Sequence, residues 1–353
     1  MLFALPKELI DYILYFTKNN LAELSLVCKY FSMNAKRMRI VDNKKYPKIR
    51  DENLQTLTNL TSLNLFRNNL ITDRGTKNLL NLNSIKLDEG SKITDRGIPP
   101  NITDLTLSSN KSITDEGIPM SLTSLNLQYE TLLSNKGVSR LTNLISLSLK
   151  DYSINDEGIS NLLNLTSLTL NDNPGLTNKG ISGLTNLTFL DLNFNEQITN
   201  EGFHNLVNLT TLKLNFNFNI NSNIDEVDRL TNLTSLDISY GKKNFVGISK
   251  LTKLTTLNLS ENETVTNNEI SNLTNLTSLN LGGNDLITDN GLILLTNLTF
   301  LNLGFNRNIT NNGISHLAKL SELDLLENYL ISNERYLRMA VCKLKNDLIY
   351  MLL

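Results

Sequence analysis

The side chains that most often perform chemistry in proteins are few and widely separated in this sequence. Its two histidines, His204 and His316, lie 112 residues apart, and neither has another histidine or a cysteine at the spacing of metal ligands. Two cysteines cannot form a disulfide framework, and Cys342 lies among apolar residues, which favours a buried thiol. The chain also lacks a G-x-S-x-G motif, a Walker A loop and a G-x-G-x-x-G loop that opens a helix after a strand. These observations predict a protein that is not an enzyme and needs no metal and no cofactor.

Composition and charge exclude further classes of protein. The 353 residues include 33 Lys and Arg against 35 Asp and Glu, so the formal net charge is −2. With a pI of about 5.8, the chain is not expected to be a dedicated nucleic-acid binder. No apolar run approaches the roughly 18 residues of a membrane span, and the opening MLFALPKEL has no signal-peptide core. We therefore expect a protein of the cytoplasm, or of the nucleus, that binds neither nucleic acid nor a membrane.

Charge is distributed unevenly along the chain. Residues 1–50 carry ten basic and four acidic side chains, a net charge of +6, which leaves −8 for the remainder. The composition changes at about residue 53, after which Leu, Asn and Thr dominate. The basic residues 36–50 could suggest nucleic-acid binding, but this segment lacks interleaved aromatic residues apart from Tyr46. We interpret residues 43–53 as a solvated basic connector between two modules.

A repeated pattern dominates the second module. The phrase L-T-x-L-x-L-x-x-N, with small variations, begins thirteen times at steps of 20–24 residues. The copies begin at Leu60, Leu82, Ile102, Leu122, Leu144, Leu165, Leu187, Leu209, Leu233, Leu254, Leu276, Leu298 and Leu320. In each copy, leucines alternate with polar residues, which is the period of a half-buried strand, and stacked copies predict a parallel sheet. The ninth residue of nine copies is Asn, which we expect to hydrogen-bond the backbone of neighbouring turns.

The second half of each copy reads I-T-D-x-G-I, as at residues 93–98. Thr before Asp is a helix N-cap signal, so short helices or 3-10 turns are predicted there, for example over 156–163 and 178–184. Prolines occupy this segment in the two 20-residue copies, where an extended or 3-10 path is expected instead. The recurrent Gly in the middle of the segment predicts close packing of helix on sheet.

These features resemble the leucine-rich-repeat family. The resemblance implies an α/β solenoid of about 13 repeats over residues 54–332, with a curved parallel sheet on the concave side and short helices or 3-10 turns on the convex side. A terminal repeat would expose its core, so the ends need caps. Residues 333–353 place apolar residues at helical spacing, which predicts a C-terminal capping helix. An amphipathic helix for a membrane or a partner is the alternative.

The first module has an apolar helical pattern of its own. Its wording, L-P, E-L and I-L followed by V-C-K-x-F, resembles the F-box over residues 2–42. An F-box followed by leucine-rich repeats implies a small all-α module that docks on the adaptor subunit of cullin–RING ubiquitin ligases. The docking residues that the resemblance implies are Leu5, Pro6, Leu9, Ile13, Leu14, Val27, Cys28 and Phe31. The alternative is that these helices only cap the first repeat.

Side chains that flank the inward leucines must point to the concave face. Most are small and polar, and the exceptions cluster in successive repeats. The candidate target-binding residues are Phe189, Asp191, Phe194, Lys213, Phe216, Asp237, Tyr240, Phe300 and Phe305. Exposed aromatic residues on a rigid sheet are typical interface anchors. In the alternative interpretation, the aromatic residues at the eighth position of the repeat pack on one another along the edge of the sheet.

Two functions follow from these resemblances. The first is a substrate-recognition subunit of an SCF-type ligase, a monomer within a hetero-complex, whose concave face binds a target protein that the sequence does not identify. The second is a non-catalytic binding scaffold unconnected with ubiquitin, similar in wording to bacterial surface repeats. The 54 Asn are typical of AT-rich coding sequence, which allows a protist or a virus of protists as the source. A viral protein of this kind would redirect a host ligase.

Overall fold

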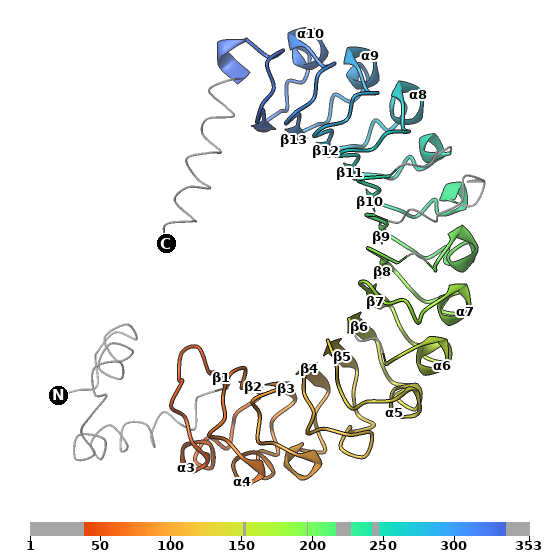
Figure 1. Cartoon of the computed structure of the whole chain (residues 1–353). Coiled ribbons are helices and arrows are strands. Elements are labelled where there is room, and N and C mark those ends of the chain that lie inside the picture. Colours follow the sequence, from red (N-terminus) through yellow and green to blue (C-terminus); the bar gives the residue numbers. More distant parts are fainter. Residues whose placement is uncertain (1–38, 151–152, 196, 217–226, 242–246, 337–353) are drawn as a thin grey trace, which may run out of the picture.

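The repeats form a curved solenoid in a computed structural model of the chain (Figure 1). The structure describes residues 39–150, 153–195, 197–216, 227–241 and 247–336. The predicted F-box helices with all their adaptor-docking residues lie outside these ranges, as does most of the predicted capping helix. In the described part, the sheet lines the inner side of the arc and the short helices line its outer side (Figure 1).

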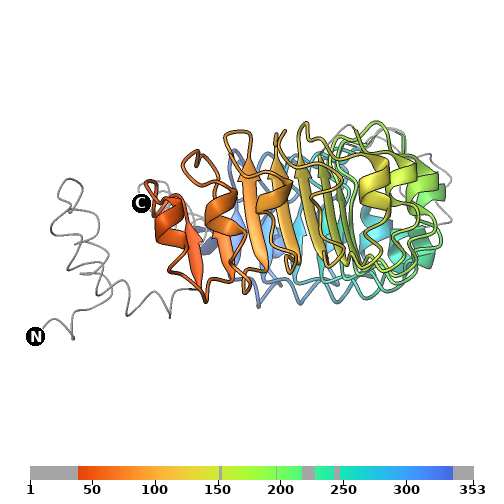
Figure 2. The same cartoon turned by 90° about the horizontal axis from the view of Figure 1, so that it is seen from below.

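One sheet of fourteen parallel strands runs through the solenoid in sequence order. Its strands are β1 (Ile40–Asp42), β2 (Ser62–Asn64), β3 (Ser84–Asp88), β4 (Asp104–Ser108), β5 (Ser124–Gln128), β6 (Ser146–Lys150), β7 (Ser167–Leu170), β8 (Phe189–Asp191), β9 (Thr211–Lys213), β10 (Ser235–Asp237), β11 (Thr256–Asn258), β12 (Ser278–Asn280), β13 (Phe300–Asn302) and β14 (Glu322–Asp324). The repeat sets the register, so that Leu190 of β8 lies opposite Leu168 of β7 and Leu212 of β9. The strands lie side by side along the solenoid (Figure 2). The predicted parallel sheet is confirmed.

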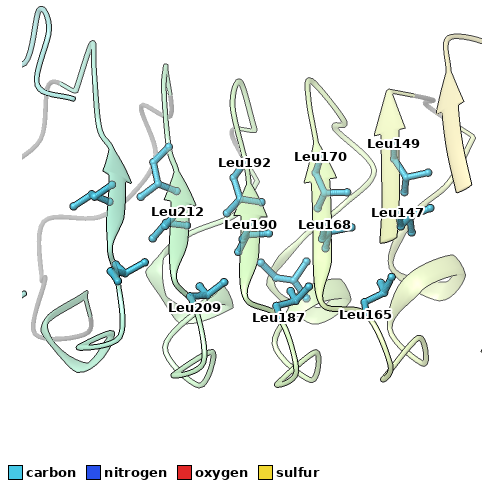
Figure 3. Packing of buried hydrophobic residues seen from close by; sticks show 14 of the residues in the cluster. Leu147, Leu149, Leu165, Leu168, Leu170, Leu187, Leu190, Leu192, Leu209 and Leu212 are labelled. Atoms are coloured by element: carbon cyan, nitrogen blue, oxygen red, sulfur yellow. The ribbon is translucent and has the colours of Figure 1, made fainter. Parts of the chain in front are cut away.

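The core is a set of leucine columns between the sheet and the outer segments. Leu187, Leu190 and Leu192 of one repeat lie beside Leu209 and Leu212 of the next, and none of the five is more than 1% exposed (Figure 3). One repeat finds apolar partners mainly in the repeats before and after it, so the stacking of repeats supplies the stability. Leucines and polar residues alternate along each strand, as predicted, so the leucines point into this core and the polar residues point to the concave side.

The solenoid begins earlier in the chain than we predicted. Strand β1 pairs with β2 in the register of a repeat, and Val41 in its centre is fully buried. Helix α3 (Asp51–Leu54) follows and buries Leu54. The predicted solvated connector over 43–53 is therefore corrected, since residues 40–54 form a fourteenth unit. The physical reason is that β2 would otherwise be an open edge strand over an exposed leucine core, and β1 covers both.

The ninth-position asparagines form a buried column of hydrogen bonds, as predicted. Asn306, which is 1% exposed, accepts from the backbone N–H of Asn308 and Ile309 at 3.1 and 3.0 Å. Its Nδ2 donates to the backbone carbonyl of Asn284 in the preceding repeat at 2.5 Å. Each amide thus satisfies buried backbone groups that no strand pairing reaches. Asn217, which we assigned to the same column, lies outside the described residues.

The convex side carries helices of three to five residues. Besides α3 they are α4 (Asp73–Thr76), η1 (Asp95–Gly97), α5 (Asn135–Ser139), α6 (Asp156–Ile159), α7 (Asn178–Ile181), η2 (Asn200–Gly202), η3 (Val227–Arg229), η4 (Ile248–Lys250), α8 (Asn267–Ile270), α9 (Asp289–Leu292) and α10 (Asn311–Ile314), where η marks a 3-10 helix. Several begin at the predicted caps, as where the Thr177 hydroxyl accepts from the N–H of Lys179. The proline-containing units have the 3-10 helix η1 and a simple turn at residues 115–117, in line with the expected path.

A second series of hydrogen bonds connects the helices of successive units. The carboxylate of Asp156 in α6 accepts from the backbone N–H and the hydroxyl of Thr177, the residue before α7, at 2.8 and 2.6 Å. The recurrent Gly leaves the space that this side chain needs. At Gly202, for example, a Cβ would lie 2.7 Å from Oδ1 of Asn178, the corresponding residue one unit earlier. Our predicted reason for the Gly is therefore corrected: it makes room for a polar side chain of the preceding unit.

Candidate functional site

The concave face is built from the third, fifth, seventh and eighth residues of each repeat. In the repeat of β8 these are Phe189, Asp191, Asn193 and Phe194, and the leucine between the first two is fully buried. Most repeats place Ser, Thr, Asn or Gly at these positions, so the strands offer a broad and mostly polar surface. Aromatic side chains at these positions are densest in the successive repeats of β8, β9 and β10, and this is where a partner could be recognised.

The eighth residue adopts a left-handed backbone conformation in most of the described repeats. Phe194, Phe216 and Tyr240 have φ angles of 61°, 56° and 57°. The N–H of Tyr240 donates to the carbonyl of Ser260 in the next repeat at 2.9 Å, so the hydrogen bonding between repeats continues beyond the strands. This conformation costs an L-residue roughly 1–2 kcal/mol. Large aromatic side chains are thus held where the backbone itself would favour glycine.

Three aromatic rings stack along this row. The ring centroids of Phe194 and Phe216 are 4.7 Å apart with an interplanar angle of 9°, and those of Phe216 and Tyr240 are 4.2 Å apart at 15°. The two outer residues, Phe194 and Tyr240, are nevertheless 52% and 41% exposed. We call these three residues the aromatic stack. Its side chains do pack on one another, as our alternative interpretation proposed, and they still present apolar surface to a partner.

Charged side chains at the fifth position accompany the aromatic stack. The Lys213 ammonium lies 3.5 Å from Oδ2 of Asp191 and 5.5 Å from the ring centroid of Phe189. Asp237 accepts from Nδ2 of Asn258 at 3.0 Å, which fixes its carboxylate beside the neighbouring strand. Seven of the nine predicted target-binding residues therefore belong to the three adjacent repeats of β8, β9 and β10.

The other two predicted residues lie apart from this region. Phe300 is in β13, three strands beyond β10, and Phe305 follows that strand at the eighth position. Phe305 is 50% exposed, and Glu261 and Gly283 occupy the eighth positions between it and Tyr240. The two phenylalanines thus form a separate group nearer the C-terminal end of the solenoid.

Sequence reasoning missed the carboxylates at both ends of the aromatic stack. Asp172 and Glu261 occupy the eighth position in the repeats just before and just after the three aromatic residues, and both have positive φ. The signal was present in the sequence, because an alignment of the copies puts these residues in one column. It was overlooked because exposed acidic residues usually carry no specific role, and only the left-handed conformation reveals the continuous row.

In the part of the chain that the structure describes, the groups that could perform chemistry do not converge. On the convex side, a ring nitrogen of His204 lies 2.7 Å from the carbonyl of Glu201, and one of His316 lies 3.0 Å from that of Leu292. Within the described ranges, no three His, Cys, Asp or Glu side chains are grouped so that they could hold a metal ion. The same part of the chain contains no helix of the length and apolarity needed to cross a membrane.

Comparisons with known proteins agree with this geometry. The leucine-rich-repeat family matches residues 56–80, 99–118, 183–203, 272–295 and 294–318, whereas no curated protein matches the chain. An internalin of Listeria monocytogenes is 27% identical, with a TM-score of 0.60 over 83% of this chain and 87% of that one. TLR13 in its complex with ssRNA13 is 27% identical, with a TM-score of 0.59 over 77% of this chain and 44% of that one.

A third solved structure, yeast Rad7 in complex with Elc1, is 19% identical, with a TM-score of 0.52 over 94% of this chain and 96% of that one. At that identity the likeness concerns the fold alone. All of the family matches lie within residues 56–318, so the F-box resemblance depends on its sequence motif. The described part of the chain is therefore a leucine-rich-repeat solenoid, a scaffold of the kind that typically binds other proteins without catalysing a reaction.

Proposed function

We propose that this protein is the substrate-recognition subunit of an SCF-type cullin–RING ubiquitin ligase. Its concave face would hold a target protein while its first residues dock on the adaptor. The observation that supports target binding most directly is the aromatic stack, because half-exposed aromatic side chains on a rigid sheet are typical anchors of protein interfaces.

The mechanism would be one of proximity. A target bound to the solenoid is held near the ubiquitin-conjugating enzyme of the assembly, which raises its effective concentration there without any chemistry in this chain. A rigid solenoid suits this role because every repeat is fixed by its two neighbours, so the place of the target along the solenoid is defined. The chain would thus select the target and set its position.

The adaptor half of the proposal depends on the motif of residues 2–42. The residues involved begin with Leu5, Pro6 and Leu9 and end with Phe31, and all lie outside the described residues. Rad7 was solved together with Elc1, but its likeness to this chain is one of fold, so the motif is the support for adaptor binding here.

Co-purification with the adaptor subunit tests this half. We expect the double variant Pro6→Ala with Leu9→Ala to lose the adaptor, while Phe216→Ala, which changes only the concave face, should retain it. Circular dichroism of both variants should show an intact repeat fold. Unchanged adaptor binding by the double variant, at equal protein levels, would refute the ligase assignment.

A second candidate is a binding scaffold unconnected with ubiquitin, and the likeness to an internalin at 27% identity favours considering it. Affinity capture with the full chain and with a variant lacking residues 1–38, which keeps β1, followed by mass spectrometry, separates the two. Under our proposal, adaptor and cullin peptides disappear with residues 1–38 and target peptides remain. In the scaffold case, neither sample contains a ligase subunit. If the protein is viral, the ligase subunits that are captured with it would be those of the host.

The structure of TLR13 is that of a complex with ssRNA13, so a nucleic acid is an alternative to a protein as the partner of this chain. The charge of the concave face argues against it in this chain. From β7 onward, the described concave positions carry seven acidic side chains and a single Lys, so a phosphate backbone would be repelled. We therefore keep a protein as the proposed partner.

A further inference from the structure

We propose that the segment bound by the aromatic stack is a basic stretch of a target protein, one that presents arginine or lysine side chains to the concave face. This inference depends on the proposed protein-binding function and specifies its partner class. It follows from the chemistry of one row of side chains and from the charge of the surrounding face.

The row has acidic ends and an aromatic middle. In order along the solenoid, its eighth-position residues are Asp172, Phe194, Phe216, Tyr240 and Glu261. Stacking covers both faces of the central ring, whereas the outer rings keep one face each and are 52% and 41% exposed. An aromatic face carries negative electrostatic potential and attracts cations, above all guanidinium groups. A carboxylate in the adjoining repeat at each end of the stack adds an ion-pair partner for the same cation.

The surrounding face has the same sign. At the concave positions of the repeats from β7 to β14, the described acidic side chains are Asp172, Asp191, Asp237, Glu261, Glu322, Asp324 and Glu327. Lys213 is the basic side chain at those positions, and its ammonium already lies 3.5 Å from Asp191. The field of this half of the face therefore attracts a basic segment and steers it toward the stack, whereas an acidic segment would be repelled.

Lys213 also shows how the surface accommodates a cation. Its ammonium lies 3.5 Å from a carboxylate oxygen of Asp191 and over the ring of Phe189, whose centroid is 5.5 Å away. An ion pair and a cation–π contact thus act on one side chain next to the stack. A lysine or arginine from the target would find the same two groups at the open end of the stack, with Tyr240 as the ring and Glu261 as the carboxylate.

The carboxylate of Glu261 is open to such a partner. It lies against Gly283, where a Cβ would clash with both of its oxygens, so the glycine leaves the space that the carboxylate occupies, and Glu261 is exposed to solvent. The seventh position is Ser260 in the repeat of Glu261, and it is Gly282 and Gly304 in the next two repeats, so these positions carry no large side chain. The glycines give an incoming side chain access to the charge, while Tyr240 on the other side supplies the apolar contact.

The test uses the full-length chain and two fluorescein-labelled peptides of equal length and equal aromatic and aliphatic content. One peptide carries arginines and the other carries glutamates at the same places, and binding is followed by fluorescence anisotropy. We expect the basic peptide to bind at least about tenfold more tightly than the acidic one. Tyr240→Ala and Glu261→Gln should each weaken its binding about two- to fivefold, the range of one exposed cation–π contact or ion pair.

Two control variants match these positions in another part of the face. Tyr129→Ala and Glu89→Gln change an aromatic and an acidic residue at the eighth position of earlier repeats, and they should leave binding of the basic peptide unchanged. If the control variants weaken it as much as the test variants do, the attraction is one of bulk charge and the inference is overturned.

The remaining outcomes separate this inference from the proposed function. Tighter binding of the acidic peptide, with loss in Tyr240→Ala, would overturn the partner class and leave protein binding by the stack intact. If neither peptide binds, the inference fails as well. Protein binding by the stack is then tested separately: it is supported if Phe216→Ala loses the targets found by affinity capture, and refuted if the variant retains them.

Discussion

A pair of glycine substitutions in one repeat tests the hydrogen bonds between successive convex helices. Gly180 lies in α7, and a Cβ there would lie closer to Oδ1 of Asp156 than the sum of the van der Waals radii of the two atoms. Gly183 follows α7, and nothing lies within 4 Å of a Cβ built on it. Gly180→Ala should therefore destabilise the protein, whereas Gly183→Ala should be neutral or stabilise it by about 0.4–1 kcal/mol through the unfolded chain.

The magnitude for Gly180→Ala follows from what the clash displaces. The Asp156 carboxylate accepts from Thr177 N–H at 2.8 Å and from its hydroxyl at 2.6 Å. Hydrogen bonds to charged groups contribute roughly 1.5–3 kcal/mol each, and partial exposure lets water replace some of the loss. Alanine returns about 0.4–1 kcal/mol through the unfolded state. We expect a net decrease of about 2–3 kcal/mol in the free energy of unfolding.

Urea unfolding followed by circular dichroism measures both variants, with an unchanged slope as the sign that the same structure unfolds. A double-mutant cycle isolates the contact. In an Asp156→Ala background the clash with the carboxylate is gone and only the contact of the added Cβ with the Cα of residue 156, at 3.3 Å, remains, so Gly180→Ala should cost much less. Equal effects of Gly180→Ala and Gly183→Ala, or an undiminished cost in the Asp156→Ala background, would contradict our account of the recurrent Gly.

Further expectations concern the core, the asparagine column, the aromatic stack and one exposed tyrosine. Leu190→Ala should cost about 2–5 kcal/mol in urea unfolding, since Leu190 is fully buried; a loss below about 1 kcal/mol would contradict the stacked core. Asn284→Ala removes an amide that accepts from the N–H of the residue at 287 at 3.0 Å, and should cost roughly 1–3 kcal/mol by the same assay. Phe216→Gly should change the free energy of unfolding by less than about 1 kcal/mol, because glycine relieves the strain of the left-handed backbone conformation while the stacking of the ring is lost. The same variant should abolish target capture. The pKa of the Tyr329 hydroxyl is raised above its usual value of about 10 by a hydrogen bond to Glu327 and by that residue's negative charge, so Glu327→Gln should lower it in an ultraviolet titration.

Much of the fold could be predicted because the same local environment recurs in every unit. A leucine at the fourth position of one copy is buried for the same reason as in the next, so period, strand positions and the inward Asn are visible in the sequence. The concave location of residues such as Phe189 and Lys213 follows from alternation alone. The first unit was missed because Ile40–Asp42 does not match the leucine pattern of the other copies. It pairs with β2 because that strand would otherwise have an unpaired edge.

The sequence by itself determined that this chain is a solenoid of stacked units, which face carries each side chain, and that an F-box-like motif precedes the repeats. The tertiary structure decided which residues of different units meet. It placed Asp156 against Gly180. It also stacked the rings of Phe194, Phe216 and Tyr240, whose backbones are in the left-handed conformation, and the repeat beyond each end of this stack carries a carboxylate at the same position. The physical reason is that these contacts join residues more than twenty positions apart, so they depend on how one coil lies on the next rather than on local pattern.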